Sequence, residues 1–236
     1  MAVLGLVALG LTGWIVLNSA FFAIRDVRIE GLRNVATEEI RELADVSAGE
    51  NLIMLPTEDV ANRVEGHPWV LDARVDRDFP ATAVITVIER RPGGWIEDPG
   101  GIAVVAGDGT VLERTQEVPV NLPAVGRDSG TLAVGDRVPA PSEPLRVAAS
   151  MGEPLRRQVE SVELEASGVV LTLREGGTVL YGGATDLPAK NGAVAEMLRW
   201  ARGEGIAVRT LDVRVPSAPS LEPVRNRVDT DPSPER

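Results

Sequence analysis

The first 24 residues of the chain carry no charged side chain, and this stretch limits what the chain can fold into more than any other feature. The hydrocarbon core of a bilayer is about 30 Å thick and needs roughly 20 apolar helical residues to cross it. Trp14 and the pair Phe21-Phe22 are aromatic residues of the kind that lie at a membrane surface. We therefore predict a single N-terminal transmembrane helix at residues 1–24.

Two other interpretations of this segment are a cleaved signal peptide and a buried helix of a soluble domain. A signal peptide has a shorter apolar run behind a basic start, and cleavage after Ala20 would leave Asn18 where a small residue is expected.

The positive-inside rule requires Lys or Arg before a span, and none is present. We place the N-terminus inside because all the folded sequence follows the span. This predicts a single-pass protein of the cytoplasmic membrane with extracytoplasmic domains.

Composition excludes several classes of function. The net charge of −11 argues against nucleic-acid binding, which depends on cationic contacts to phosphate. The chain has no cysteine, so it has no disulfide, thiolate metal site or cysteine nucleophile. His67 is the only histidine, and it precedes a proline in a predicted loop without another metal ligand nearby. The sequence therefore predicts no catalytic residue, no metal site and no cofactor, hence a protein that is not an enzyme.

Residues 25–92 predict a small α+β domain. Val27 and Ile29 alternate with polar residues before Gly31, as in a strand. Two amphipathic helices follow, with inward faces that contain Ile40, Leu43 and Ala44 in the first and Val60, Ala61 and Val64 in the second. Two strands flank Phe79-Pro80, and their predicted buried residues are Val70, Ala73, Val75, Ala83, Ile85 and Val87. The predicted order is β-α-α-β-β, with two helices on one face of a three-stranded sheet.

The cluster Glu89-Arg90-Arg91-Pro92 closes this domain and has two interpretations. In the first, a strand ends with a local ion pair, and the proline fixes the entry to the next domain. In the second, the charges form a partner-facing cluster at the domain junction. The residue types alone do not separate the two.

Residues 93–215 predict a mixed, β-rich domain with flanking helices. Strands at 102–106 and 110–112 flank the turn Gly107-Asp108-Gly109, and a meander is predicted at 162–164, 169–173 and 179–181. The segment around Leu122-Pro123 and Gly126 predicts a loop. Helices are predicted at 142–151 and 189–201, and a last strand at 207–215. Residues 216–236 are rich in Pro, Ser and charge without apolar periodicity, so they predict a disordered tail.

The order of these motifs resembles a known family. The pattern Phe22, Val27-x-Ile29-x-Gly31, Pro68-Trp69-Val70, Ala73-x-Val75-x-Arg77 and Glu89-Arg90-x-Pro92 looks like a POTRA domain. Placed after a single span, it resembles the bacterial cell-division family FtsQ, also called DivIB. The later motifs Leu122-Pro123, Val179–Gly182, the helix from Lys190 onward and Asp212-Val213-Arg214-Val215-Pro216 are similar to the second domain of that family.

The resemblance implies a divisome scaffold at the septum whose closing strand receives FtsB, in complex with FtsL. The strand 207–215 alternates one mostly apolar set with one polar set, and we predict that it lies at the sheet edge, where a partner strand can pair with it. An ordinary protected edge is the alternative. The implied partner contacts are Asp212, Val213, Arg214, Val215, Ser217 and Ala218. Pairing should end at Pro216, which lacks an N–H donor.

Two rival functions stay open at this point. A POTRA domain also occurs in docking or chaperone modules for protein export or outer-membrane assembly, although those usually carry tandem repeats and a β-barrel. A tethered hydrolase or small-ligand binder would need a polar pocket with clustered acids, and no motif in this sequence indicates one. The sequence favours the scaffold, with partners of the FtsB/FtsL type, a lipid bilayer at residues 1–24 and no small-molecule substrate.

Overall fold

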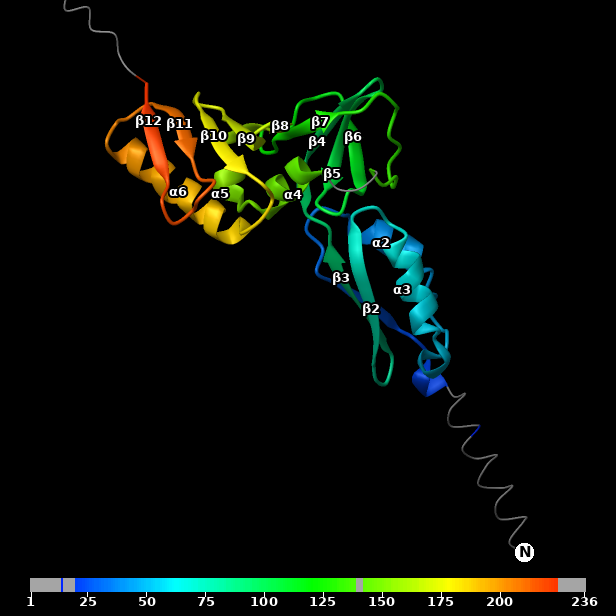
Figure 1. Ribbon diagram of the computed structural model, residues 1–236. Helices are drawn as coiled ribbons and strands as arrows, with labels where there is room; N and C mark the ends of the chain where they lie inside the picture. Colours follow the sequence, from blue (N-terminus) through cyan, green and yellow to red (C-terminus); the bar gives the residue numbers. More distant parts are fainter. Residues whose placement is uncertain (1–13, 15–19, 139–141, 225–236) are drawn as a thin grey trace, which may run out of the picture. The chain divides into compact units, whose positions relative to one another are not determined.

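The computed structural model describes residue 14, residues 20–138 and residues 142–224 (Figure 1). The chain divides into two units, Met1–Arg91 and Pro92–Arg236, one residue before the boundary predicted from the sequence. Each unit has its own hydrophobic core. The predicted transmembrane helix at residues 1–24 falls largely outside the described residues, and no helix within them has the length and apolar character that a membrane crossing requires.

The first unit has two helices on one face of a three-stranded sheet (Figure 1). Its elements are η1 (Ala20–Phe22), β1 (Asp26–Glu30), α2 (Thr37–Ala44), η2 (Leu52–Met54), α3 (Thr57–Glu65), β2 (Val70–Asp78) and β3 (Thr82–Glu89). The strand order is β1-β3-β2, with β1 parallel and β2 antiparallel to β3. The predicted β-α-α-β-β order is therefore confirmed.

The core of the first unit follows from the strand and helix periodicities. All the residues predicted to be buried on the last two strands are buried: Val70, Ala73, Val75, Ala83, Ile85 and Val87. Two expectations need correction. Leu43 is 37% exposed, because the inward face of α2 is narrower than its three apolar residues suggested. Ile24 was assigned to the anchor, but it is buried in this core, and its N–H donates to the Glu50 carbonyl at 2.8 Å.

Glu89 joins the end of β3 to the loop between β1 and α2. Its carboxylate accepts hydrogen bonds from the N–H groups of Arg33 at 2.7 Å, Asn34 at 3.0 Å and Val35 at 3.2 Å. Burial alone would raise the pKa of Glu89, but these hydrogen bonds hold it below its ordinary value. Arg90 donates to the Pro68 carbonyl at 2.8 Å. Glu89 and Arg90 thus have hydrogen-bond partners within the domain, and none of these contacts is the local ion pair that the first interpretation expected.

The second unit is built on one long mixed sheet. Its strands are β4 (Pro92–Asp98), β5 (Gly101–Ala106), β6 (Val111–Thr115), β7 (Ala124–Arg127), β8 (Val159–Glu165), β9 (Gly168–Leu173), β10 (Thr178–Gly182), β11 (Val208–Asp212) and β12 (Ser220–Pro223). Within the described chain the order is β12-β11-β10-β9-β8-β7-β4-β5-β6. The predicted hairpin and the predicted meander are both present.

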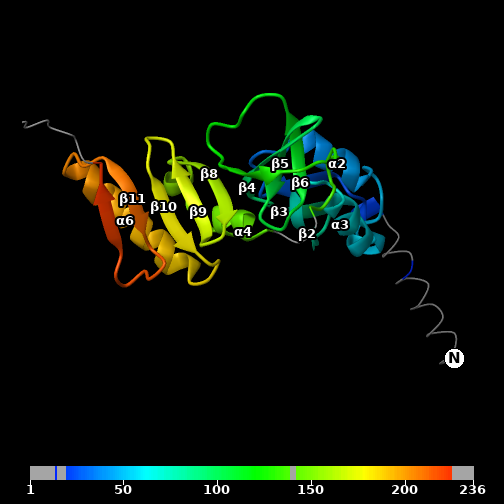
Figure 2. The same ribbon diagram turned by 45° about the horizontal axis from the view of Figure 1, so that its top comes forward.

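Three helices pack against this sheet: α4 (Glu143–Ser150), α5 (Glu153–Arg156) and α6 (Leu187–Gly203). Figure 2 shows α6 along one face of the strands β8 to β11. Ser142 begins α4, because its side-chain oxygen accepts a hydrogen bond from the Leu145 N–H. Leu145 and Ala148 of α4 are buried, and the same holds for Val194, Leu198 and Ala201 of α6.

Two strands of the second unit were not predicted. The segment with Leu122-Pro123 and Gly126 was expected to be a loop, but residues 124–127 form β7, which is parallel to β4 and bridges it to β8. Its four residues are too few to show an alternating pattern, and its pairing is decided by distant partners. The second missed strand is β12, within residues predicted to be disordered.

Candidate partner-binding edge

The strand expected to close the sheet is an interior strand. β11 pairs in parallel with β10 on one side and antiparallel with β12 on the other. The prediction that residues 207–215 form the sheet edge is therefore wrong. After Val213 the chain turns back, and the Ala218 N–H donates to the Val215 carbonyl at 3.0 Å. Residues 220–223 then cover the side of β11 that the sequence had left open.

β12 also corrects the predicted disordered tail. Residues 216–224 are part of the folded unit, and Leu221 packs against its hydrophobic core. The prolines and serines of this stretch suggested disorder. The strand forms nevertheless, because it supplies partners for the backbone groups on the outer side of β11. The remainder of the predicted tail, residues 225–236, lies outside the described part of the chain.

The six residues predicted to contact a partner lie in or directly after β11, and they differ in accessibility. Asp212 ends β11, opposite Ser220. Val213 is fully buried, and its N–H donates to the Leu180 carbonyl at 3.0 Å, so its side chain cannot reach a partner. The four exposed members lie together in the β11–β12 turn: Arg214, Val215, Ser217 and Ala218.

Arg214 and Asp212 form an ion pair at the start of this turn. The guanidinium approaches the carboxylate through Nη2 at 2.6 Å and Nε at 3.1 Å, and the Arg214 N–H donates to Asp212 Oδ1 at 3.0 Å. The hydrogen bond from the Arg214 side chain lowers the pKa of Asp212, and that of Arg214 is raised in turn. Gly182 lies next to the Arg214 side chain and has a φ of +73°. A Cβ at this position would lie only 3.1 Å from Arg214 Cγ.

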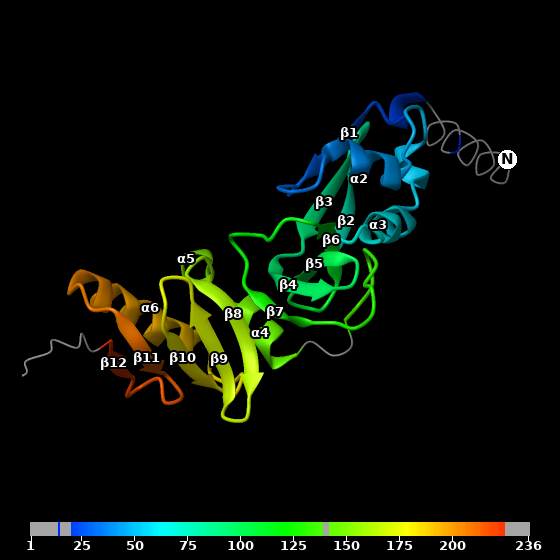
Figure 3. The same ribbon diagram turned by 90° about the horizontal axis from the view of Figure 1, so that it is seen from above.

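The outer side of β12 carries backbone groups that no described strand uses. Just after β11, the Val213 N–H donates to Leu180 of β10. Backbone groups alternate in direction along a strand, so the N–H and C=O groups of Thr210 and Asp212 point toward β12. Residues that face each other in such antiparallel pairs exchange both hydrogen bonds, so Glu222 and Ser220 are satisfied by β11. Leu221, between them, therefore directs its N–H and C=O outward. Figure 3 shows β12 beyond β11 at the end of the sheet.

A groove runs between α6 and the β11–β12 turn. It encloses about 730 Å³ and is lined by small and apolar residues that include Gly192, Met197, Trp200 and Pro216. Trp200 is 49% exposed. A wide, shallow and largely apolar surface beside an open strand edge suits a peptide better than a small metabolite.

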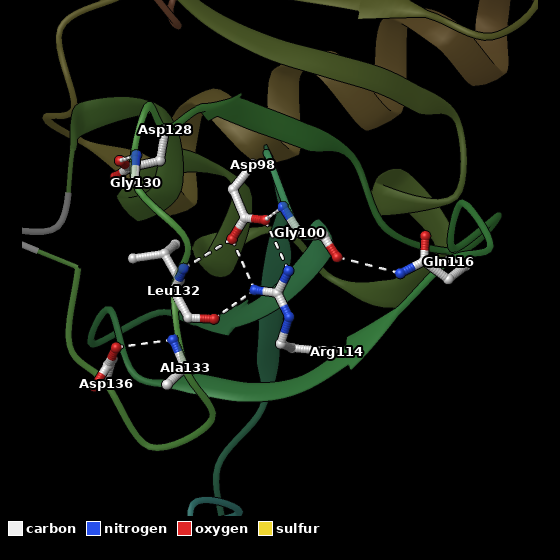
Figure 4. Close-up of polar contacts among 9 residues, drawn as sticks. All are labelled: Asp98, Gly100, Arg114, Gln116, Asp128, Gly130, Leu132, Ala133 and Asp136. Atoms are coloured by element: carbon white, nitrogen blue, oxygen red, sulfur yellow. Dashed lines mark hydrogen bonds and ion pairs between the residues drawn. The ribbon is translucent and has the colours of Figure 1, made fainter.

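The opposite edge of the sheet is covered at the start of β6. Residues 135–138 pair with residues 109–111: the Val111 N–H donates to the Asp136 carbonyl at 2.8 Å, and the Val138 N–H donates to the Gly109 carbonyl at 2.9 Å. A buried carboxylate holds this loop in place (Figure 4). Asp98 accepts two hydrogen bonds from Arg114, both at 2.7 Å, and one from the Leu132 N–H at 2.9 Å. The two edges of the sheet thus differ: a loop pairs beside β6, and no described segment pairs with the outer side of β12.

His67, the only histidine, contacts two neighbouring residues. The His67 Nε2 lies 3.3 Å from Glu39 Oε2, and its Nδ1 accepts a hydrogen bond from the Trp69 N–H. These contacts give the histidine a structural place at the end of α3. Within residues 20–138 and 142–224, no three side chains of His, Asp or Glu are grouped to hold a metal ion.

Comparisons with known proteins match the first unit to a described type of domain. Residues 22–90 match the model of the POTRA domain, FtsQ-type. Cell division protein FtsQ of Anaeromyxobacter sp. (strain K) is 35% identical over 48% of this chain and 40% of its own length. Cell division protein FtsQ of Mycobacteroides abscessus is 26% identical over 94% of this chain and 68% of its own length. This chain therefore spans well under half of the first relative and about two thirds of the second.

Among solved structures, the major extracytoplasmic domain of the trans isomer of DivIB from Geobacillus stearothermophilus is similar at 16% identity. The alignment covers 38% of this chain and 76% of that chain, with a TM-score of 0.29.

Proposed function

We propose, from the premise that this chain is a member of the FtsQ (DivIB) family of bacterial cell-division proteins, that it is a non-enzymatic scaffold of the divisome. It holds partner proteins of the FtsB/FtsL type at the septum, with its folded units on the extracytoplasmic side of the cytoplasmic membrane. The FtsQ-type POTRA match over residues 22–90 and the relatives described above support the division role.

The observation that carries the proposed mechanism is the open outer side of β12. A partner strand pairs there by strand addition, which uses main-chain hydrogen bonds for affinity and side-chain pockets for specificity. Leu221 supplies the outward N–H and C=O, and Pro219 and Pro223 on either side have no N–H to donate. The paired region is therefore short, and a partner needs further contacts beyond it.

Those contacts come from the neighbouring turn and groove. Arg214, Val215, Ser217 and Ala218 are exposed beside the edge, and Arg214 offers a cation held in position by Asp212. An apolar side chain of the partner enters the groove next to Trp200. Exposed edges are usually blocked in monomeric proteins because they promote unwanted pairing. Residues 135–138 cover the start of β6, whereas no described segment pairs with the outer side of β12, and this difference supports a functional use of the β12 side.

The membrane segment supplies the second part of the mechanism. Residues 1–19 are uncharged and largely apolar, which is close to the roughly 20 residues that a span requires. Confinement of this chain and its partners to one membrane raises their effective concentration, so a short interface is enough for stable assembly.

A capture experiment tests the edge. Full-length protein is used to co-purify FtsB and FtsL homologues from the same organism, and two variants at one position are compared. Leu221→Pro removes the outward N–H, whereas Leu221→Ala removes a similar part of the side chain and keeps the N–H. We expect at least a tenfold loss of capture for Leu221→Pro and a much smaller loss for Leu221→Ala. Equal capture by both variants would rule out strand addition at β12.

Two further measurements bound the proposal. Arg214→Ala should weaken capture, and Arg127→Ala, which alters an ion-paired, more exposed arginine on β7, should not. Depletion of the protein should give filamentous cells without septa. Normal septa combined with a loss of surface proteins would instead favour a role in export.

A further inference from the structure

All three phenylalanines of the chain meet at one end of the first unit. Phe21 and Phe22 contact each other edge to face with ring centres 5.1 Å apart, and Phe22 contacts Phe79 in the same way at 6.1 Å. Phe79 comes from the β2–β3 turn, far along the sequence from the other two. Figure 1 shows this turn and η1 at the same end of the unit.

Backbone hydrogen bonds fix the three segments that build this end. The Gly49 N–H donates to the Ile24 carbonyl at 2.9 Å, which joins the start of the unit to the loop before η2. The Arg25 N–H donates to the Ala81 carbonyl at 2.9 Å, which joins it to the β2–β3 turn. Arg77 donates through Nε to the Leu52 carbonyl at 2.9 Å, so β2 is tied to η2 as well. The aromatic contacts are therefore part of a rigid arrangement.

Each of these three segments exposes one large apolar side chain. Phe21 is 59% exposed, Met54 is 57% exposed and Phe79 is 56% exposed. Burial of such a side chain stabilises a protein, so exposure at three neighbouring segments is unfavourable in water. An apolar surface of this kind marks a contact with a partner or a membrane. We call the set Phe21, Phe22, Met54 and Phe79 the aromatic tip.

The segment that precedes the first unit indicates what covers the aromatic tip. Residues 1–19 precede η1 directly, and they include no charged residue. If they span the bilayer, the tip begins where the hydrocarbon core ends. The headgroup layer there is about 5–8 Å thick on each side. Aromatic side chains are enriched in this layer.

We propose that the aromatic tip lies in the headgroup region of the membrane, so that the β2–β3 turn gives the first unit a second contact with lipid. This inference rests on the proposed membrane anchor. A single covalent connection lets the unit rotate freely, whereas a second contact through Phe79 restricts its tilt over the membrane. Of the flanking acids, Asp78 pairs with Arg28 at 3.9 Å, and Glu50 accepts a hydrogen bond from the Ser47 N–H.

The absence of cysteine from the chain permits a direct test. Full-length Phe79→Cys is labelled with an environment-sensitive fluorophore and reconstituted into vesicles of phosphatidylethanolamine and phosphatidylglycerol. Ile88→Cys is the matched control, because Ile88 is 52% exposed near the other end of β3. We expect blue-shifted emission and strong quenching by brominated lipid for the label at position 79. The label at position 88 should emit as it does in water, with at most a few per cent quenching.

Flotation of the vesicles separates the possible failures. If the protein floats with the vesicles but the label at position 79 reports water, the aromatic tip does not touch the membrane. If the protein does not float at all, the anchor itself is wrong, and this inference fails with it. Met54→Cys provides a second labelled position on the tip and should behave like Phe79→Cys. Thermal unfolding of the labelled proteins shows whether each variant is folded.

Discussion

The only lysine of the chain, Lys190, lies over the ring of the only tyrosine, Tyr181, with its ammonium 5.1 Å from the ring centre. Lys190 is 3% exposed, and its Nζ donates to the Gly183 carbonyl at 2.8 Å. The Tyr181 hydroxyl donates to the Asn191 side chain at 3.1 Å, and Asn191 donates to the Ser150 carbonyl at 3.1 Å. This network joins β10, α6 and α4.

Replacement of the buried lysine should destabilise the second unit. Lys190→Met keeps most of the side-chain volume but removes the hydrogen bond to Gly183 and the cation–π contact. We expect a loss of about 1–2 kcal/mol in the free energy of unfolding, measured by urea denaturation. Ala189→Met places the same side chain on the exposed face of α6 and should change stability by less than about 0.5 kcal/mol. A Lys190→Met variant as stable as the wild type would mean that the network contributes nothing.

Tyr181 should make the fold sensitive to high pH. Burial raises the pKa of Tyr181 to about 12, from an ordinary value of 10. The folded protein therefore keeps a proton that the unfolded chain releases, and stability falls as the pH rises from about 10 to 12. Since the chain has one tyrosine, the ultraviolet absorption of the phenolate reports this residue alone. In the folded protein the absorption should appear about two pH units later than in concentrated urea. Titration at the same pH in both states would contradict the burial.

Asp98 should make the second unit sensitive to acid. Its hydrogen bonds from Arg114, and then from the Leu132 N–H, hold the pKa of Asp98 far below its ordinary value. The ionised carboxylate of Asp98 stabilises the fold fully at a pH above the ordinary pKa of an aspartate, about 4, and this stabilisation is lost as the pH falls below that value. Asp98→Asn should weaken this acid dependence and increase hydrogen exchange at Leu132. The control is Asp128→Asn, which alters an exposed carboxylate in the same loop and should leave Leu132 protected. An unchanged exchange rate in Asp98→Asn would contradict the role of Asp98 in holding the loop over β6.

Glu89 should stabilise the first unit through its three backbone donors. Glu89→Gln leaves one neutral acceptor oxygen for the N–H groups of residues 33–35, so we expect a loss of about 1–2 kcal/mol. Thermal unfolding of the full chain measures the change. Glu30→Gln alters an exposed carboxylate on β1 and should be nearly neutral. If both variants unfold like the wild type, the hydrogen bonds to Glu89 are not a significant part of the stability.

The local patterns determined much of the first unit in advance. Alternation on β2 and β3 and the apolar faces of α2 and α3 predicted both the element order and nearly all the buried residues, because periods of 2 and 3.6 are properties of adjacent residues. The uncharged run at residues 1–24 likewise needed no structure to suggest an anchor. Its last residues were assigned wrongly, since the burial of Ile24 depends on the distant loop at Gly49 and Glu50.

Only the tertiary structure decided which strand ends the sheet and which side chains meet. β12 is a short segment, Ser-Leu-Glu-Pro, that becomes a strand because β11 offers it unpaired backbone groups. β7 forms between two partners distant in sequence. The burial of Lys190 and the meeting of Phe22 with Phe79 depend on the same long-range pairing. The sequence by itself determined the elements with strong local periodicity and the presence of an apolar N-terminal segment. Pairing between distant segments determined the exposed edge, the buried charge and the aromatic tip, since none of these is encoded within a single element.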